Sequence, residues 1–378
     1  MRLQTKLFLN LVLILLSKGL FCQTTDKDAK NYSTLSSDIL TILKDTKVVG
    51  VSVAIIDNYK VTWAQGFGLK EVGAKDSVTA ETIFQAASIT KSVVALAIMR
   101  EFQDGKVSLN EDVNTYLQEW KIPTNEYTKK SSITLKQLLS HTSGISNTTF
   151  PSYDPDERIP TAVQALNGVS PARNEEVTVT SYPGKMFAYS NSGYALVQQI
   201  LTDTEKRGFE EIMYDKIFSQ LEMTYSNFNY HLPNGKFKSV ASGHLKGNEV
   251  IKCKYYVLQP MAFGSLWSTP TDLANFLIEI QLSLVGKSNK ILNQENTRLM
   301  LKPVSNSSGG QYSLGFEIEK RGTGVTFFGH DGHNYGYISS MLGSLEGGFG
   351  VVIMTNSENG WKAVNKIKKL VGRKYWGF

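Results

Sequence analysis

The segments with β-strand character lie near the two ends of this chain, separated by a long stretch rich in loops and short helical patterns. Residues 49–56 are rich in β-branched side chains and end in a turn signal, after which residues 60–67 continue as a second strand. Four more candidate strands follow late in the chain, over residues 313–318, 325–328, 337–344 and 349–354. Glycine-rich turns between them suit antiparallel connections. We therefore expect one antiparallel sheet built from both chain ends.

Helical periodicity indicates the segments that should flank this sheet. Apolar spacing predicts helices over residues 35–43, 88–102, 271–284 and 361–375. This order of elements predicts an α+β fold in which a mostly helical subdomain, residues 107–261, is inserted into the sheet part. The sheet part would consist of residues 33–106 and 262–378.

The first 22 residues have the composition of a secretory signal. Arg2 and Lys6 precede an apolar run over residues 7–16, and a short cleavage zone follows. The run is too short to cross a bilayer, so we expect no stable membrane span. Cleavage before Gln23 predicts a secreted or periplasmic protein. A lipid anchor on Cys22 is the alternative, which the bulky Phe21 disfavours.

Charge and cysteine content exclude several classes of function. The formal net charge is +6, but the signal carries three cations and no acids, which leaves +3 on the mature chain. That charge is too mild to indicate a nucleic-acid partner. After cleavage only Cys253 remains, so an internal disulfide is impossible.

The first chemical motif is Ser88-Ile89-Thr90-Lys91, at the start of the predicted helix over residues 88–102. Ser88 and Lys91 would share one helix face, so the amine could reach the hydroxyl. A serine hydroxyl needs a base nearby, and burial lowers the pKa of a lysine enough for it to act as one. Ser88 is the only serine with a lysine three residues later. The alternative is a helix-capping serine beside a solvated lysine.

The second motif is Tyr189-Ser190-Asn191, in a loop before an apolar helical run. Such a loop can direct a phenol at the serine and an amide at the substrate. The tripeptide recurs at residues 225–227, but the first copy follows Pro-Gly and precedes a helix, so we take the first as functional.

The third motif is His330-Asp331-Gly332, placed after the strand predicted over residues 325–328. His330 would supply a polar group near the nucleophile, and Gly332 would let substrate lie against the strand. His330 and His333 could be read as a metal pair, but no third ligand has useful spacing, so we expect neither a metal nor a cofactor.

In this order, Ser88-x-x-Lys91, Tyr189-x-Asn191 and His330-x-Gly332 resemble the class C β-lactamase and DD-peptidase family, peptidase family S12. Residues 133–144, 268–273 and 354–357 are similar too, and the resemblance covers about residues 33–375. It implies the β-lactamase/transpeptidase-like fold.

The resemblance also implies roles for the motif residues. Ser88 would attack an acyl carbonyl while Lys91 and Tyr189 move its proton, and Asn191 would orient the substrate. The backbone N–H groups of Ser88 and His333 would form the oxyanion hole. Residues 142–144 would hold the helical subdomain against the catalytic helix.

The sequence departs from the family at its third motif, which in β-lactamases is usually Lys-Thr-Gly. Here His330 and Asp331 occupy the first two positions. An Asp331 side chain in the pocket would repel a carboxylate-bearing substrate. If that side chain points away or pairs with a cation, the objection disappears. No separate glutamate for activating a deacylating water is recognisable, so turnover would depend on Tyr189, Lys91 or His330.

The leading interpretation is an exported serine acyl hydrolase that forms an acyl-enzyme on Ser88 and cleaves an ester, amide or peptide bond. Its partner would be a small-molecule or peptide acyl substrate. One alternative is a true β-lactamase or DD-carboxypeptidase. An alternative of another class is a penicillin-recognising sensor or trap that is acylated without turnover.

Overall fold

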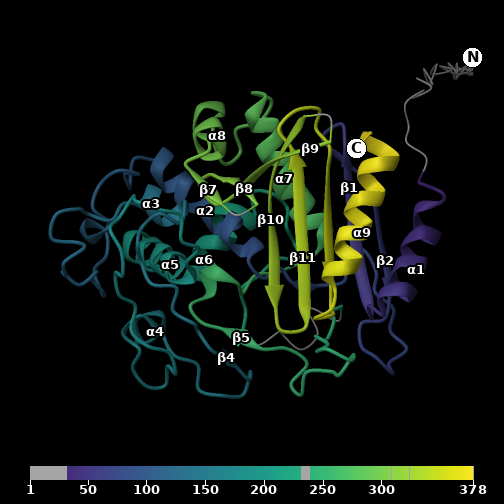
Figure 1. Ribbon diagram of the computed structural model, residues 1–378, viewed down its shortest axis with the longest axis horizontal. Helices are drawn as coiled ribbons and strands as arrows, with labels where there is room; N and C mark the ends of the chain where they lie inside the picture. The colour runs from purple at the N-terminus through teal and green to yellow at the C-terminus, as the bar shows by residue number, and fades with distance from the viewer. Residues whose placement is uncertain (1–31, 231–238, 308, 323, 378) are drawn as a thin grey trace, which may run out of the picture.

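The computed structural model describes residues 32–377, except 231–238, 308 and 323. An antiparallel sheet of eight strands forms its centre, in the order β2-β1-β12-β11-β10-β9-β8-β7. Figure 1 shows this sheet covered by helices on both faces. The strands are β1 (Gly50–Asp57), β2 (Lys60–Gly68), β7 (Ser305–Ser307), β8 (Gly310–Tyr312), β9 (Glu317–Arg321), β10 (Val325–Asn334), β11 (Tyr337–Ser344) and β12 (Gly350–Thr355).

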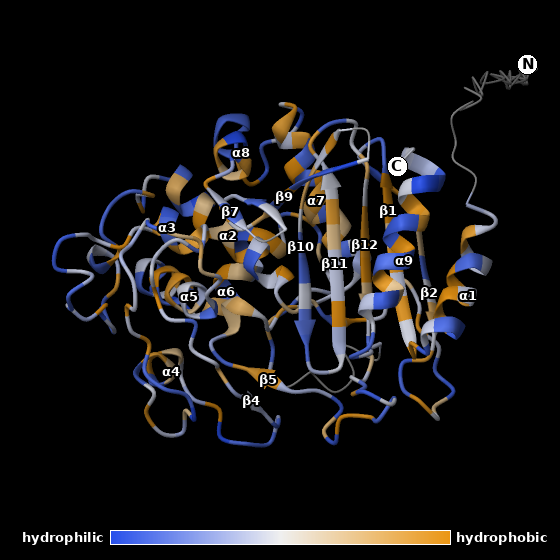
Figure 2. Cartoon of the chain, viewed as in Figure 1, coloured by the Kyte–Doolittle hydropathy of each residue, from blue (hydrophilic) through white to orange (hydrophobic). Residues whose placement is uncertain are grey.

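Strands from the N-terminal and C-terminal parts of the chain pair directly within this sheet. Strand β1 pairs with β12 in a register that places Val51 opposite Thr355. Both faces of β1, β11 and β12 are buried, which explains the nearly continuous apolar sequence of β1 and β12. Figure 2 shows β1 and β12 as hydrophobic over most of their length, whereas the lower half of β10 is hydrophilic. The predicted α+β fold with a sheet from both chain ends is confirmed.

Helices α1 (Leu35–Thr46) and α9 (Trp361–Val371) cover one face of the sheet. Their apolar sides form a core with β1, β11 and β12 that includes Ile39, Val53 and Ile367. The sequence predicts that the last helix reaches residue 375. In the structure α9 ends at Val371, and a π-helical turn, Gly372–Trp376, follows it.

The opposite face of the sheet packs on α2 (Ile89–Gln103) and α7 (Pro270–Leu284). Helix α7 begins as its sequence predicts, because Thr269 accepts a hydrogen bond from the Asp272 N–H and Pro270 occupies the first turn. The remaining helices are α3 (Leu135–Leu139), α4 (Ala162–Asn167), α5 (Asn191–Glu205), α6 (Phe209–Met213) and α8 (Gln294–Leu301), with short helical turns η1 (Val113–Thr115), η2 (Tyr214–Phe218) and η3 (Met261–Phe263).

Residues 107–261 carry α3 to α6 and long loops, and two pairs of two-residue strands lie within or just outside them. These pairs are β3 (Phe84–Gln85) with β6 (Trp267–Ser268), and β4 (Ser152–Tyr153) with β5 (Val257–Leu258). The boundaries predicted for the inserted subdomain stay a prediction. Within the described residues, no helix is long and apolar enough to cross a membrane.

Two strand predictions were wrong in ways that matter for the site. Residues 313–318 do not form one strand, because Gly315 adopts a positive φ of 93° and a tight turn separates β8 from β9. The strand predicted over residues 325–328 extends to Asn334, so the third motif lies inside β10 rather than after it.

Candidate active site

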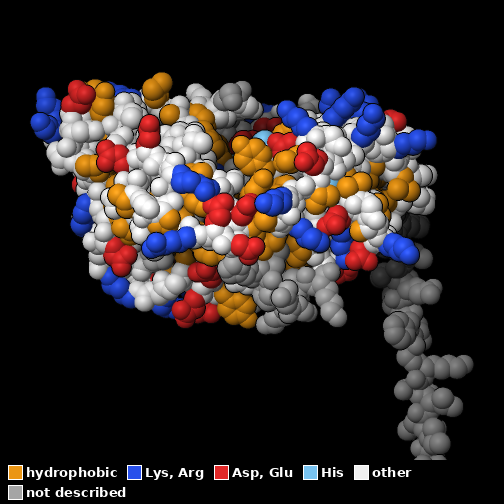
Figure 3. All heavy atoms as spheres, turned by 90° about the horizontal axis from the view of Figure 1, so that it is seen from below, with side chains coloured by type: hydrophobic (Ala, Val, Ile, Leu, Met, Phe, Trp, Pro, Cys, Tyr) orange, Lys and Arg blue, Asp and Glu red, His pale blue; other side chains and the backbone are white. Residues whose placement is uncertain are grey.

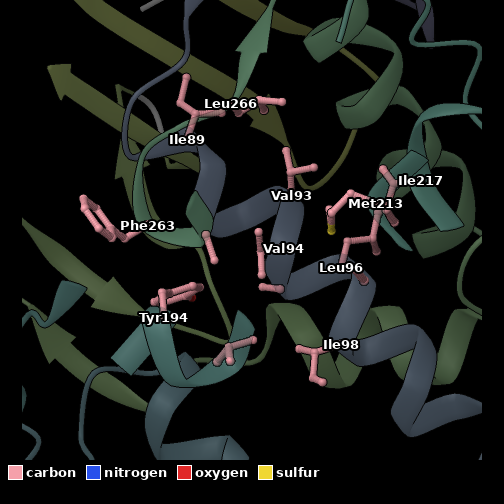
Figure 4. Packing of buried hydrophobic residues seen from close by; sticks show 14 of the residues in the cluster. Ile89, Val93, Val94, Leu96, Ile98, Tyr194, Met213, Ile217, Phe263 and Leu266 are labelled. Atoms are coloured by element: carbon pink, nitrogen blue, oxygen red, sulfur yellow. The ribbon is translucent and has the colours of Figure 1, made fainter. Parts of the chain in front are cut away.

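Ser88 lies at the N-terminus of α2, directly after a residue with unusual backbone geometry. Ala87 has a φ of 50°, in the left-handed region that non-glycine residues rarely occupy. The Ala87 carbonyl accepts a hydrogen bond from the Thr90 hydroxyl at 2.6 Å, which holds this turn in place. Helix α2 is buried almost all round, and Figure 4 shows its side chains packed between those of other elements. Ser88 therefore stands on a rigid support.

Lys91 lies one turn further along and contacts Ser88. Its Nζ donates to the Ser88 Oγ at 3.1 Å and to the carbonyl oxygen of Phe263 at 2.6 Å. The Lys91 side chain is completely buried, and this burial lowers its pKa well below the ordinary value. Lys91 can therefore release its proton far more readily than a solvated lysine. The capping alternative, which needs a solvated lysine, is wrong.

Tyr189 faces this pair from the loop before α5. The Lys91 Nζ lies 4.9 Å from the centre of the Tyr189 ring. Burial raises the pKa of Tyr189 strongly, while a hydrogen bond with Ser88 opposes that rise. The phenol is therefore protonated at neutral pH. Asn191 is the first residue of α5, and its backbone N–H donates to Asn147 at 2.9 Å.

The second Tyr-Ser-Asn copy, residues 225–227, has a different setting. The Ser226 hydroxyl donates to the Asp272 carboxylate at 2.8 Å, and the Tyr225 N–H donates to the same carboxylate at 2.9 Å. This copy therefore packs on the beginning of α7.

His330 lies on β10 with its side chain on the α2 side of the sheet. Its Nδ1 is 2.6 Å from the Asp331 carbonyl oxygen, which can only accept a hydrogen bond, so Nδ1 carries the proton. The Nε2 then accepts from the Tyr312 hydroxyl at 3.1 Å. Burial, with a smaller contribution from Lys91, lowers the pKa of His330 to about 4. His330 is therefore neutral at pH 7.

Asp331 points to the other face of the sheet. Its carboxylate accepts hydrogen bonds from Lys368 of α9, with Nζ 3.2 Å from each oxygen, and from the Ser340 hydroxyl. The Lys368 side chain is 5% exposed and that of Asp331 39%. Of the two orientations that the sequence left open, the structure places Asp331 away from the pocket and against a cation.

Gly332 lies where β10 passes the residues just before Ser88. A Cβ at this position would stand 2.5 Å from the Ala86 carbonyl oxygen and 2.3 Å from the Ser339 hydroxyl. The sequence interpretation assigned this glycine to substrate contact, but close approach of the backbone already requires it. His333 follows on the strand, and its side chain turns outward to Glu358, with Nε2 2.7 Å from a carboxylate oxygen.

The role proposed for the His333 N–H is compatible with the sheet topology. Strand β9 pairs with β10 only from Val325 to Gly329, so in the described part of the chain residues 330–334 pair with β11 alone. The segment that precedes Ser88 packs on the face of this stretch at Gly332. The oxyanion hole stays a prediction.

A hollow of about 280 Å³ adjoins the site through Phe263 and His333, on the side of the molecule that Figure 3 shows, although Ser88, Lys91, Tyr189 and His330 do not line it. Its wall includes His333 and Phe263, whose carbonyl contacts Lys91, together with three further aromatic rings. None of its ten lining residues is Lys, Arg, Asp or Glu. They are Gln85, Thr149, Phe150, Ser152, Tyr256, Leu258, Phe263, His333, Asn334 and Tyr335.

Sequence reasoning missed several groups around the nucleophile. The Phe263 carbonyl is a backbone atom, so no residue type could indicate it. Tyr312 precedes the turn that the strand prediction overlooked. Glu317 lies outside this group, on β9 beside β10, where burial together with Asp331 raises its pKa to about 7. Among the described residues, no group of three or more His, Cys, Asp or Glu side chains could hold a metal ion.

Known proteins share both the sequence and the fold. Residues 35–371 match the model of the Beta-lactamase family. The chain is 26% identical to "Protein flp" of Staphylococcus aureus (strain MRSA252) over 323 residues, which are 83% of this chain and 60% of that protein. It is 30% identical over 180 residues to "Serine beta-lactamase-like protein LACTB, mitochondrial" of Mus musculus, covering 46% of this chain and 31% of that protein. The chain thus spans about three fifths of the length of the flp relatives.

Solved structures support the same assignment. The octameric penicillin-binding protein homologue from Pyrococcus abyssi has a TM-score of 0.72 and 26% identity, with 90% of this chain and 78% of that chain covered. D-amino acid amidase from Ochrobactrum anthropi SV3, complexed with L-phenylalanine amide, has a TM-score of 0.70 and 23% identity over 90% and 98% of the two chains. With a family model matched over nearly its whole length, this chain belongs to the beta-lactamase family.

Proposed function

We propose that this protein is an exported serine acyl hydrolase that forms an acyl-enzyme on Ser88 and cleaves esters or amides with an uncharged acyl group. The observation that carries the proposal is the contact between the buried Lys91 amine and the Ser88 hydroxyl, 3.1 Å apart. A solvated amine would be fully protonated at neutral pH and unable to accept a proton. Burial gives the neutral amine a usable population.

The chemistry would run in two steps. Neutral Lys91 accepts the Ser88 proton while the serine oxygen bonds to the acyl carbon, and the carbonyl oxygen gains the negative charge. The carbonyl then re-forms and the bond from the acyl carbon to the leaving alcohol or amine breaks, while the Tyr189 phenol, protonated because its pKa is raised, relays a proton from Lys91 to that leaving group. Water then attacks the Ser88 ester with the same groups acting in reverse, and the free acid leaves.

The acyl preference follows from the charges near the nucleophile. The neutral His330 cannot supply the cation that would hold a substrate carboxylate, and the lining of the hollow holds no lysine or arginine. Its rings Phe150, Tyr256 and Tyr335 suit an apolar or aromatic acyl group instead. One observation favours the rival substrate class, β-lactams and D-Ala-D-Ala termini. Asp331 faces Lys368, so it does not repel a carboxylate in the pocket.

The test is a substrate panel on the mature chain that begins at Gln23. It contains p-nitrophenyl acetate, p-nitrophenyl phenylacetate, a D-amino acid amide and a chromogenic cephalosporin. We expect turnover of the two esters, faster for the phenylacetyl ester, with a burst of one p-nitrophenol per enzyme if deacylation is slow. Ser88→Ala should abolish it. The matched control Ser37→Ala removes a hydroxyl that only bonds the Thr34 carbonyl on α1 and should keep full rates.

Each outcome decides between the candidate functions. Ester turnover that survives in Ser88→Ala would refute the proposal. Efficient turnover of the cephalosporin alone would identify a β-lactamase. One equivalent of bound label with no turnover of any substrate would identify a sensor or trap.

Export is tested separately by N-terminal sequencing of the protein made in its own host. Gln23 as the first residue would support a cleaved signal, and a lipid-modified Cys22 would indicate an anchor.

A further inference from the structure

His141 follows α3 and holds the chain on both sides of Tyr189. Its backbone carbonyl accepts a hydrogen bond from the Ala188 N–H at 2.7 Å. Its ring Nδ1 accepts another from the Ser190 N–H at 3.1 Å. One residue therefore binds the residue before the phenol and the residue after it. The positive φ of His141, 56°, allows its ring and its carbonyl to reach the same loop.

The His141 ring also packs on the phenol itself. Its centre lies 4.3 Å from the centre of the Tyr189 ring, with a tilt of 37°. The same ring lies 5.0 Å from Tyr312, the residue that donates to His330. His141 thus contacts the two tyrosines that approach the nucleophile and the third motif.

The protonation state of His141 follows from these contacts. Because Nδ1 accepts the Ser190 N–H, the proton of the neutral ring lies on Nε2. That Nε2 is buried and has no hydrogen-bond partner within the described chain. Burial lowers the pKa of His141 well below its ordinary value, as do Lys91 and His330. An unpartnered buried N–H is costly, so the bond from the Ser190 N–H to Nδ1 and the ring contacts must offset that cost.

We propose that His141 is a positioning residue that fixes the Tyr189 phenol against Ser88. It uses its carbonyl, its Nδ1 and its ring face together, so the phenol keeps both its position and its tilt. This inference rests on the proposed function, because Tyr189 matters only where Ser88 is acylated. A displacement of about 1 Å at such a group lowers a rate by about 100-fold.

Two substitutions separate the contacts that His141 makes. His141→Asn places an amide oxygen near the Nδ1 position and tolerates positive φ, but it removes the ring. His141→Phe retains a ring and removes the acceptor for the Ser190 N–H. Ser143→Ala is the matched control, because that buried hydroxyl belongs to the same turn and, among the residues that the structure describes, bonds only the Ile145 N–H at 3.3 Å.

The readouts are kcat and KM on p-nitrophenyl acetate and the rate of Ser88 labelling by a fluorophosphonate. We expect His141→Phe to lower kcat and labelling about 10- to 100-fold while KM changes less than about 3-fold. His141→Asn should recover part of that loss. Ser143→Ala should leave kcat unchanged even where it lowers stability. In a Tyr189→Phe background, His141→Phe should have almost no further effect on kcat.

Failure of this inference differs from failure of the proposed function. If fluorophosphonate does not label Ser88 in the unmodified protein, the proposed function fails. If it does label Ser88, and folded His141→Phe reacts at the same rate, only the positioning role fails. Equal losses from His141→Phe with and without Tyr189 would also overturn it, because the effect would then bypass the phenol.

Discussion

Burial of a neutral His330 should make the fold lose stability in mild acid. Its pKa is about 4 in the folded chain, against 6.5 for an unperturbed histidine. Between these values the unfolded chain binds a proton at this position and the folded chain does not. The free energy of unfolding therefore falls as the pH decreases through that window, and above it the full stability is present.

The expected size follows from the two pKa values. Lowering the pH from 8 to 5 should remove about 2 kcal/mol of stability through His330 alone. In His330→Gln this contribution disappears, so the variant should lose about 2 kcal/mol less than the unmodified protein over the same change in pH. Other buried groups, such as Asp272 with its pKa raised to about 6 by burial, titrate in both proteins and cancel in the comparison.

The assay is urea unfolding followed by tryptophan fluorescence at pH 8 and pH 5. Met341→Leu is the control, because Met341 lies opposite His330 on β11, is buried and does not titrate. It should lower stability equally at both pH values and keep the pH dependence of the unmodified protein. If His330→Gln lost as much stability in acid as Met341→Leu, the buried neutral histidine would be the wrong explanation. His330→Asn serves as a second variant if the glutamine variant does not fold.

Two further predictions concern the neighbours of His330 on β10. Gly332→Ala should cost about 1–3 kcal/mol in urea unfolding and slow fluorophosphonate labelling of Ser88, because its Cβ would collide with Ala86. Gly309→Ala, where a Cβ meets nothing within 4 Å, should do neither, and equal effects would contradict the packing argument. Asp331→Thr should destabilise the fold by about 1–3 kcal/mol, since it leaves the buried Lys368 amine without its partner. The ratio of cephalosporin to ester turnover should stay unchanged, and a rise in that ratio would show that Asp331 acts in the pocket after all.

The sequence predicted those parts of the fold whose signal is local and apolar. Strand β1 could be recognised because both of its faces are buried, and α7 because its cap and its apolar spacing agree. The end of β10 was missed because its residues 329–334 are Gly, His, Asp, Gly, His and Asn, which have low strand propensity. Pairing with β11 holds these residues extended in spite of their low strand propensity. A short sequence window does not show which strand will pair with them.

The candidate site also contains residues that a short motif predicts and residues whose position only the fold determines. Short motifs predicted Ser88, Lys91 and Tyr189, and the structure brings these three together. The direction of Asp331 depends on strand register and on Lys368, 37 residues later in the chain, so the motif alone left two orientations open. Residues 142–144 were expected to be structural, whereas the histidine just before them contacts Tyr189.

The pairing of β1 with β12 determines when the sheet can form during synthesis of the chain. Residues about 300 positions apart are neighbours in this sheet, so the β1–β12 pair cannot form until the last tenth of the chain is available. The nascent chain must therefore hold Ser88 and a strongly apolar α2 for most of its synthesis without the surface that covers them. If the proposed export and hydrolase activity hold, late closure would also keep the enzyme inactive until the whole polypeptide has crossed the membrane.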